Sequence, residues 1–349
     1  MQSTKNLQRC EVKRTGPAGQ ALPLLDTLET TDRKSPIEGA SERKRRSRKV
    51  AKQLKMIGYE GKARKIEQCA SMLYRRSFSC GHESHTRHGQ WESFYLCKDK
   101  FCPNCNHVRS LKLSRSLGGA LERYASEQGL HAYHVVLTFL NTDSLPDYER
   151  IRRQARRLFD SGSRVRKAFW DRYGYHGAVM NFEVTVARDG RFHPHFHVLL
   201  FTERPIELIE SGEHSGKFQN KVNQELSDMW LSITKDSYIL QGQSFEFSHM
   251  FEMVKYLTKG VDMIPDEQLS ELVEWSSGRR FISLIGKLYK NEQLKQLTEA
   301  EDMGDSECCP ECGCNEYVDI PMRFDLARGQ YVDDEYWTGE IIGIPRRAP

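Results

Sequence analysis

Two strand-like runs of sequence, residues 178–187 and 192–201, constrain the fold more than any other feature. Only residues 188–191 separate them, and these residues include an Asp-Gly pair. An Asp-Gly pair between two apolar, alternating runs is a strong signal for a β-hairpin. We therefore expect an antiparallel sheet, with the second run in its middle.

Further elements follow from the spacing of apolar residues on either side of this hairpin. The sequence predicts strands over residues 132–140 and 243–249, and helices over residues 109–127, 147–172, 218–232 and 251–259. We expect helix 147–172 to be interrupted near Gly162. These elements indicate an α+β fold in which helices flank a central antiparallel sheet.

Three histidines alternate along the second run of the hairpin. In a strand, His193, His195 and His197 point to one face, while the apolar residues between and after them point to the other. Two or three imidazoles on one face can hold a divalent cation, provided that each ring is neutral and that a partner fixes its second nitrogen. The sequence therefore predicts a metal site on this strand.

The length of the hairpin turn decides whether an acidic residue joins the histidines. A three-residue loop with Gly190 in the left-handed region pairs Glu183 with His195. A two-residue turn pairs Glu183 with Phe196 instead, which directs the carboxylate to the other face. We expect the first register, because a carboxylate completes a site for a hard cation better than imidazoles alone.

A second group of reactive side chains lies in the expected helix 251–259. Glu252 and Tyr256 are four residues apart and share a face, and Lys255 and Lys259 form a basic stripe beside them. A tyrosine can attack a phosphodiester and become covalently attached to it. The lysines can bind the phosphate, and the glutamate can activate water or orient the hydroxyl group.

The chain has ten cysteines, and the expected cytoplasmic location favours metal ligation over disulfides because the cytosol keeps thiols reduced. Cys97, Cys102 and Cys105 have metal-ligand spacing. We expect Cys80 to be the fourth ligand of a structural zinc site, with His82 as its substitute. Such a site could present its basic neighbours to DNA, namely Lys98, Lys100 and Arg109.

A second cysteine run near the C-terminus resembles one knuckle of a zinc ribbon, although no second knuckle follows it. The run comprises Cys308, Cys309, Cys312 and Cys314. These residues bind a second zinc within the run, or they complete a site with Cys69 or another partner, or they are redox-sensitive thiols.

The charge pattern and the hydropathy restrict the partners of the chain. The net charge is only +4, but basic residues crowd positions 43–55 and 150–167. A clustered basic face can bind the phosphate backbone of DNA. A charged surface that contacts only solvent explains either cluster equally well. No apolar run is long enough for a membrane helix, and residues 1–5 lack the apolar run of a secretory signal. We therefore expect a cytoplasmic protein with no membrane contact.

Taken together, four stretches of sequence resemble the rolling-circle replication initiators of small bacterial plasmids, which belong to the HUH endonuclease superfamily. The stretches are Cys97–Cys105, Val136–Leu140, His193–Leu200 and Lys255–Lys259, in the order that is typical of the family. Residues 182–185 also look like the family's sequence. The resemblance covers about residues 95–262.

The resemblance implies a reaction and roles for the motif residues. Such proteins nick one DNA strand at an origin, become joined to its 5′ phosphate through a tyrosine, and rejoin the ends after one round of replication. The resemblance further implies that Tyr256 is the nucleophile and that His195 and His197 bind magnesium or manganese. Glu252 matches a glutamate proposed to act at termination in members that have one tyrosine in the motif. Tyr289 is too distant to be a second motif tyrosine.

The resulting hypothesis divides the chain into four regions. They are a flexible basic arm (1–58), a Cys/His zinc module with a linking helix (59–128), an HUH nicking domain (129–265), and a C-terminal region with the cysteine knuckle (266–349). The implied partners are single-stranded or hairpin origin DNA, a host helicase and a DNA polymerase. The rival functions are a single-tyrosine transposase or relaxase and a zinc protein that binds DNA without catalysis, although the latter leaves the histidines and Tyr256 unexplained.

Overall fold

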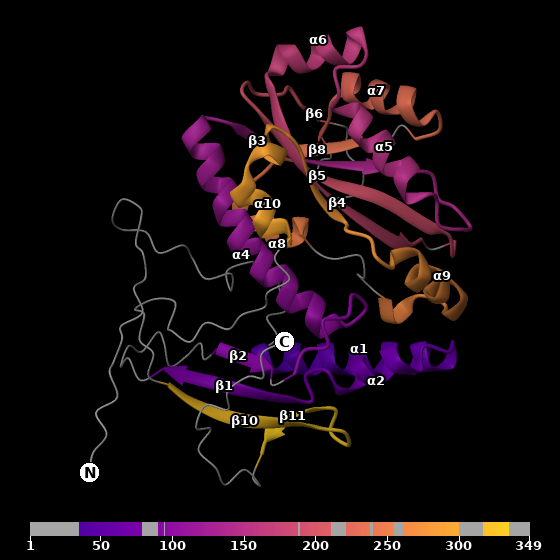
Figure 1. Ribbon diagram of the computed structural model, residues 1–349, viewed down its shortest axis with the longest axis vertical. Coiled ribbons are helices and arrows are strands. Elements are labelled where there is room, and N and C mark those ends of the chain that lie inside the picture. The colour runs from indigo at the N-terminus through magenta and orange to yellow at the C-terminus, as the bar shows by residue number, and fades with distance from the viewer. Residues whose placement is uncertain are drawn as a thin grey trace.

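The computed structural model describes residues 35–78, 90–93, 95–187, 189–210, 221–237, 240–254, 261–299 and 317–334. Within these ranges the chain forms two antiparallel sheets and a set of packed helices (Figure 1). The expectation of antiparallel sheets with flanking helices is confirmed. In this part of the chain, no helix is both long and apolar enough to cross a membrane.

The larger sheet has seven strands in the order β6-β7-β8-β3-β5-β4-β9. Their bounds are Ile209–Glu210 (β6), Lys221–Val222 (β7), Leu240–Ser244 (β8), His131–Thr138 (β3), Phe192–Thr202 (β5), Tyr175–Val186 (β4) and Ile282–Gly286 (β9). The predicted hairpin forms β4 and β5, and the histidine strand β5 lies between β3 and β4 as expected. Its backbone groups are therefore paired on both sides, which makes β5 a rigid platform.

Alternation along β4 and β5 gives this sheet two different apolar faces. Phe182, Phe196 and Val198 belong to one buried cluster, which the apolar stripes of four helices extend. These helices are α5 (Tyr148–Leu158), α6 (Arg164–Tyr173), α7 (Gln224–Thr234) and α9 (Asp266–Ser276). Leu199 and Phe201 belong to a second buried cluster, which includes residues of α4 (Pro103–Gln128), α8 (Met250–Met253) and α10 (Glu292–Glu299). The sheet is thus covered on both faces (Figure 1).

The smaller sheet joins two distant parts of the chain in the order β11-β10-β1-β2. Its strands are Gln330–Asp333 (β11), Tyr317–Asp325 (β10), Met72–Phe78 (β1) and Gln90–Ser93 (β2). Helices α1 (Pro36–Met56) and α2 (Glu60–Gln68) pack against each other beside this sheet (Figure 1). The C-terminal region therefore completes a sheet that the N-terminal part of the chain begins.

Helix α1 corrects the expectation of a flexible arm for residues 36–56. A capping box of Ser35 and Glu38 begins the helix, and the side chains of Val50 and Leu54 are fully buried. The basic residues that dominate this segment obscured the small buried stripe on its inner face. Residues 1–34 lie outside the described part of the chain.

Other boundaries also differ from the sequence prediction. The strand expected over 243–249 is β8, which ends at Ser244, and a 3-10 helix, η2, spans Phe247–His249. The helix expected over 251–259 is described as helical only to Met253, and residues 255–260 lie outside the described ranges. Helix 147–172 is interrupted near Gly162 as expected, which separates α5 from α6.

Gly118 sets how closely α8 approaches α4. A Cβ atom at this position would lie 2.8 Å from Cγ and 3.2 Å from Cβ of Met250, the first residue of α8. The next residue, Gly119, has room, since its Cβ would meet only the Arg123 guanidinium group at 3.7 Å. The absence of a side chain at Gly118 therefore lets the short helix α8 pack on α4, against the face of the sheet that carries Leu199.

We predict opposite effects on stability for alanine at these two adjacent glycines. Gly119→Ala should raise the free energy of unfolding by about 0.5–1 kcal/mol, because alanine restricts the unfolded chain and favours helix. Gly118→Ala should lower it by about 1–3 kcal/mol, because the new methyl group displaces Met250. Denaturant unfolding of both variants measures the difference. Equal effects would show that the contact between α4 and α8 does not depend on Gly118.

Candidate functional site

The hairpin register brings an acidic residue to the histidines. Glu183 on β4 pairs with His195 on β5, and Ala187 N–H donates to the Arg191 carbonyl at 2.8 Å. Gly190 has a φ of 81°, in the left-handed region that a three-residue loop requires. The predicted register is therefore confirmed, and the alternative pairing with Phe196 is excluded.

Glu183, His195 and His197 form a compact group whose potential ligand atoms all lie within 4.8 Å of one another. Glu183 Oε2 is 3.3 Å from His195 Nε2 and 2.9 Å from His197 Nε2. Glu183 and His195 are buried, whereas His197 is partly exposed. The group therefore has one side toward solvent, from which a substrate oxygen can approach.

Two features of the group suit a cation. The Nδ1–H of His195 donates to the His193 carbonyl at 3.2 Å, which leaves Nε2 as an acceptor that faces the Glu183 carboxylate. Two acceptor atoms at 3.3 Å repel each other unless a proton or a metal ion lies between them. The other carboxylate oxygen, Glu183 Oε1, is buried and has no hydrogen-bond partner among the residues that the structure describes. A divalent cation would satisfy both atoms.

The pKa of Glu183 supports this arrangement. Burial of the side chain raises its pKa, but the hydrogen bonds and charges of His195 and His197 outweigh burial and lower the pKa to about 2. The carboxylate is therefore ionised at neutral pH, whether protons of the two histidines or a divalent cation balance its charge.

A fourth histidine, His134 on β3, was not predicted. Its Nε2 lies 2.9 Å from His197 Nδ1, and the two rings stack with centroids 5.1 Å apart. Burial and the neighbouring His197 lower the pKa of His134 to about 4, so the ring is neutral and can accept the Nδ1–H of His197. This contact leaves His197 Nε2 available as a ligand. In the sequence, His134 is only an isolated histidine among apolar residues. It joins the site through the pairing of β3 with β5, which the sequence does not reveal.

His193, by contrast, is not brought into the compact group. Its Nδ1–H donates to the Asn141 side-chain oxygen at 2.7 Å, and its ring centroid is 5.2 Å from that of His195. His193 lies beside the group on the same strand, and it contributes its carbonyl to His195 rather than a fourth ligand atom.

The end of α8 is held against the same face of the sheet by two buried side chains. Asn181, which pairs with His197 across the hairpin, donates through Nδ2 to the Met253 carbonyl at 3.0 Å. Ser110 on α4 donates through Oγ to the Val254 carbonyl at 3.3 Å. The segment that carries Tyr256 begins immediately after these carbonyls. Neither side chain was predicted, because single Asn and Ser residues give no signal in a sequence.

The remaining residues of the tyrosine motif are only partly described. Glu252 lies on α8 with an exposed side chain. Lys255, Tyr256 and Lys259 lie outside the described residues, so their predicted roles stay predictions.

A second compact group consists of Cys69, Cys97, Cys102 and Cys105. Cys69 ends helix α2, Cys97 lies in the segment between β2 and α4, and Cys102 and Cys105 lie at the beginning of α4. Cys80 and His82, of which one was expected to be the fourth metal ligand, lie outside the described residues. Cys69 was considered only as a partner for Cys308, Cys309, Cys312 and Cys314, which also lie outside them.

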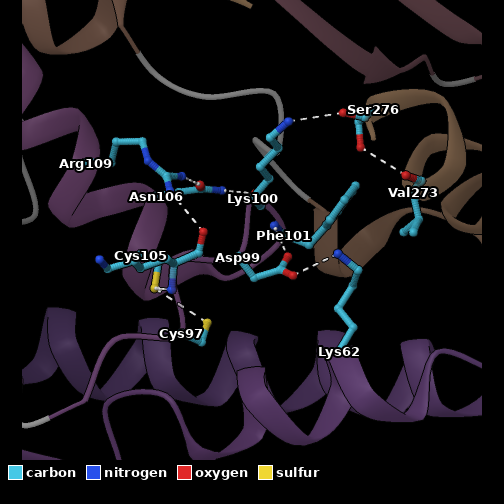
Figure 2. Close-up of polar contacts among 11 residues, drawn as sticks. Lys62, Cys97, Asp99, Lys100, Phe101, Cys105, Asn106, Arg109, Val273 and Ser276 are labelled. Carbon is cyan, nitrogen blue, oxygen red and sulfur yellow. Dashed lines mark hydrogen bonds and ion pairs between the residues drawn. The ribbon is translucent and has the colours of Figure 1, made fainter. Parts of the chain in front are cut away.

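The geometry of the cysteine group suits a tetrahedral metal ion. Cys105 Sγ is 3.5 Å from Cys69 Sγ and 3.6 Å from Cys97 Sγ (Figure 2 draws the second contact). Zinc–sulfur bonds of about 2.3 Å in a tetrahedron separate the sulfurs by about 3.8 Å. Hydrogen bonds from Cys105, Cys69 and Cys97 hold the pKa of the Cys102 thiol well below its usual range. The thiolate form of Cys102 is therefore favoured over the thiol, and the thiolate is the form that binds a metal ion.

A buried lysine fixes the turn that carries Cys69. The side chain of Lys44 on α1 is 2% exposed, and its Nζ donates to the Cys69 carbonyl at 2.6 Å, to the Glu67 carbonyl at 2.6 Å and to Ser71 Oγ at 3.0 Å. All three donors of the ammonium group are satisfied, although burial lowers its pKa to about 8. The cysteine group thus lies where α1, α2 and α4 meet.

The loop that follows Cys97 is hydrogen-bonded to the end of α9 and the residues after it. Lys100 Nζ donates to the carbonyls of Ser276 and Arg279, at 3.1 and 2.8 Å (Figure 2 shows the first contact). Arg109 donates to the Lys98 carbonyl at 3.0 Å. Lys100 and Arg109 thus bind backbone carbonyls within the protein, and the expectation that this loop presents basic residues to DNA stays a prediction.

A comparison with known proteins identifies the family to which this chain belongs. A family model described as "Replication protein" matches residues 89–317, which is more than half of the chain. The chain belongs to the replication-protein family. The match contains the cysteine loop from Cys97, both hairpin strands and the tyrosine segment, so the resemblance that these motifs carry is confirmed at the level of the family. No solved structure matches the chain.

Relatives with the name "Protein rep" support the same family. One from Lentilactobacillus hilgardii is 25% identical over 281 residues, which cover 75% of this chain and 83% of the relative. Another from Lactiplantibacillus plantarum is 26% identical over 286 residues, with 75% and 82% covered. A third, from Streptococcus pneumoniae serotype 2, is 29% identical over 200 residues, with 56% and 58% covered.

We predict that Cys69 and not Cys80 is required for metal at the cysteine group. Cys69→Ser should lower the bound metal of the purified protein by one equivalent and reduce the soluble yield, since structural metal contributes folding free energy directly. Cys80→Ser is the matched control and should retain the metal. Elemental analysis of both variants measures this. Loss of metal in Cys80→Ser alone would restore the ligand set expected from the sequence.

Proposed function

We propose that this protein nicks and rejoins one DNA strand at a plasmid origin of rolling-circle replication, through a covalent 5′-phosphotyrosine at Tyr256. The strongest support is the position of the Glu183, His195 and His197 group beside the end of α8, three residues before Tyr256. Three residues of extended chain span about 10 Å at most, so a tyrosine three residues after Met253 is within reach of the metal ligands. An antiparallel sheet with paired histidines on a central strand also supports the HUH endonuclease fold.

The proposed metal site divides its tasks among the residues of this chain. A magnesium or manganese ion would polarise a phosphate oxygen. His195 and His197 would hold the ion through Nε2, because their Nδ1–H groups donate to the His193 carbonyl and to His134. Glu183 supplies the hard oxygen ligand that these cations prefer.

In the proposed reaction, the Tyr256 hydroxyl oxygen attacks phosphorus and the bond from phosphorus to the 3′ oxygen breaks. The tyrosine proton passes to solvent or to the departing 3′ oxygen, so that a free 3′ hydroxyl remains for a DNA polymerase. Lys255 and Lys259 would bind the phosphate. Reversal of the same step rejoins the strand, because the phosphotyrosine bond retains the energy of the diester.

Glu252 is proposed to act at the end of the cycle. A motif with one tyrosine needs water for the final cleavage, and Glu252 is the nearest carboxylate in sequence, with an exposed side chain on α8. The regenerated strand would be cut by this water after the host helicase has displaced it.

The cysteine group is proposed to hold structural zinc. Its contacts join α1 and α2 to α4, so the ion would fasten the N-terminal helices to the helix that packs on the nicking sheet. We propose residues 129–265 as the nicking unit and add β9 to it, because β9 pairs with β4. Residues 59–128 would remain the zinc module and its linking helix.

We predict that Tyr256→Phe binds origin DNA with unchanged affinity but neither nicks it nor forms a covalent adduct, because it removes the attacking oxygen. Tyr289→Phe is the matched control, since Tyr289 is exposed and distant in sequence, and it should form the adduct normally. The test incubates each protein with manganese and supercoiled plasmid, then separates protein-linked nicked circles. An adduct in Tyr256→Phe would move the nucleophile elsewhere.

We predict that Asn181 positions the tyrosine segment rather than the metal. Asn181→Ala should lower kcat for nicking by about 10- to 100-fold, because a small displacement of the attacking group is costly. It should leave the KM for DNA and the affinity for manganese unchanged.

The control for Asn181 is Asn223→Ala. Asn223 is also buried and donates to a carbonyl, that of Glu207 at 2.8 Å, but it begins α7 on the other face of the sheet. Each variant should lose about 1–2 kcal/mol of stability, while only Asn181→Ala loses nicking. A fall in manganese affinity in Asn181→Ala would instead show that this residue supports the metal ligands.

A further inference from the structure

Helix α5 carries five arginines in eleven residues and a single acidic residue, Glu149. Its inner stripe is buried in the sheet core and contains Tyr148, Ile151, Ala155 and Leu158. The burial of this stripe forces the arginines outward. Arg150, Arg153 and Arg157 are exposed, and the other two, Arg152 and Arg156, are partly exposed.

Among the described residues, Arg152 is the one of these arginines that forms an ion pair, while Asp147, just before the helix, interacts electrostatically with Arg150 and Arg153. Glu149 pairs with Arg152 at 2.7 Å. Arg150 reaches only the Gln154 amide oxygen, at 3.3 Å, and Arg153 Nε donates to the Glu149 backbone carbonyl at 3.2 Å. Arg156 Nε is buried without a hydrogen-bond partner. Like charges held together in this way repel one another, and a polyanion would relieve the repulsion.

The other basic cluster of the chain, on α1, is used differently. Lys44 is buried beneath Cys69, Arg46 pairs with Asp262 at 2.8 Å, and Arg45 donates to the Gly329 carbonyl at 2.7 Å. Three of its cations therefore hold the N-terminal helices to the rest of the protein. Within the described residues, the side chains of the exposed Arg150 and Arg153 of α5, by contrast, form hydrogen bonds only with residues of the same helix, so they hold no other part of the protein in place.

We propose that the outer face of α5 binds the phosphate backbone of double-stranded DNA on the side of the sheet opposite the metal site. This inference rests on the proposed function, since it assumes that the protein acts on DNA. Arg150, Arg153 and Arg157 form a row about 10 Å long, because seven residues of helix rise 1.5 Å each. Such a row fits successive phosphates of a duplex.

The chemistry of this face favours duplex over single-stranded DNA. Proteins that bind single strands combine basic residues with exposed aromatic rings on which bases stack. The aromatic residue of α5, Tyr148, is buried, and none of the large exposed apolar or aromatic side chains in the described ranges belongs to this helix. The face also lies across the sheet from Glu183 and His195, so a duplex bound there leaves the metal site open to the strand that is cut.

The test compares two triple variants that remove the same charge from exposed helix positions. R150Q/R153Q/R157Q alters α5, and K49Q/K52Q/K55Q alters α1 as the control. Glutamine keeps helix propensity, so both should fold, which circular dichroism checks. Binding to a short duplex of arbitrary sequence, and to the corresponding single strand, is measured by fluorescence anisotropy from about 50 to 200 mM salt.

We expect the α5 variant to bind duplex at least about tenfold more weakly and to lose about three units of the slope of log affinity against log salt, one for each phosphate contact. The control should change the slope by less than about one unit. Both variants should still form the covalent adduct on a single strand that carries the nick site. This second measurement separates the binding proposal from the proposed reaction. If the wild-type protein formed no adduct, the proposed reaction would be wrong, but the result for duplex binding would still hold.

Three outcomes would overturn the proposal. Unchanged duplex binding of the α5 variant would make the arginines a solvated face. Equal losses in both triple variants would indicate a general effect of net charge. A larger loss for the single strand than for the duplex would assign the face to the displaced strand.

Discussion

The pairing of β4 with β5 is the constraint on which the rest of the site depends. Glu183 faces His195 only because the loop between the strands has three residues and Gly190 adopts a left-handed conformation. A shift of one residue would turn the carboxylate toward the cluster that contains Phe196, where a buried charge has no partner. The same register places Asn181 opposite His197, so one backbone pairing positions both the ligands and the contact that holds α8.

Much of this part of the molecule is local and could therefore be predicted from the sequence. The hairpin turn, the alternation of histidines and the interruption near Gly162 are all encoded within about ten residues of where they act. Helix α4 and strand β3 likewise follow from their own apolar spacing. Even the third potential ligand, Glu183, could be placed, because a hairpin is the one tertiary arrangement whose register depends on a short loop.

The features that could not be predicted depend on contacts between distant parts of the chain. Cys69 and Cys80 are both upstream of Cys97, and spacing does not distinguish them; the fold does, because the C-terminal end of α2 reaches the beginning of α4. His134 contacts His197 only through the pairing of β3 with β5. Strand β10 pairs with β1 more than two hundred residues earlier, and no local pattern in a short strand reveals such a partner.

Polar groups on the α4 side of the sheet explain why the site lies where it does. This face is apolar along Val179, Leu199 and Phe201, where α4 and α8 cover it. Beyond that cover it carries Asn181 and Glu183, which would be costly to bury without partners. Each is compensated in a different way. Asn181 donates a hydrogen bond to the Met253 carbonyl at the end of α8.

Within the described residues, Glu183 keeps one oxygen without a partner, and an unsatisfied buried oxygen costs about 1–3 kcal/mol. The sheet tolerates this cost because both neighbouring strands bond β5 along its length and prevent the hairpin from rearranging. A rigid platform that holds an unsatisfied carboxylate between two fixed imidazoles gains stability from whatever cation occupies it. The local instability of the group and its capacity to bind a cation therefore have one origin, the register of β4 on β5.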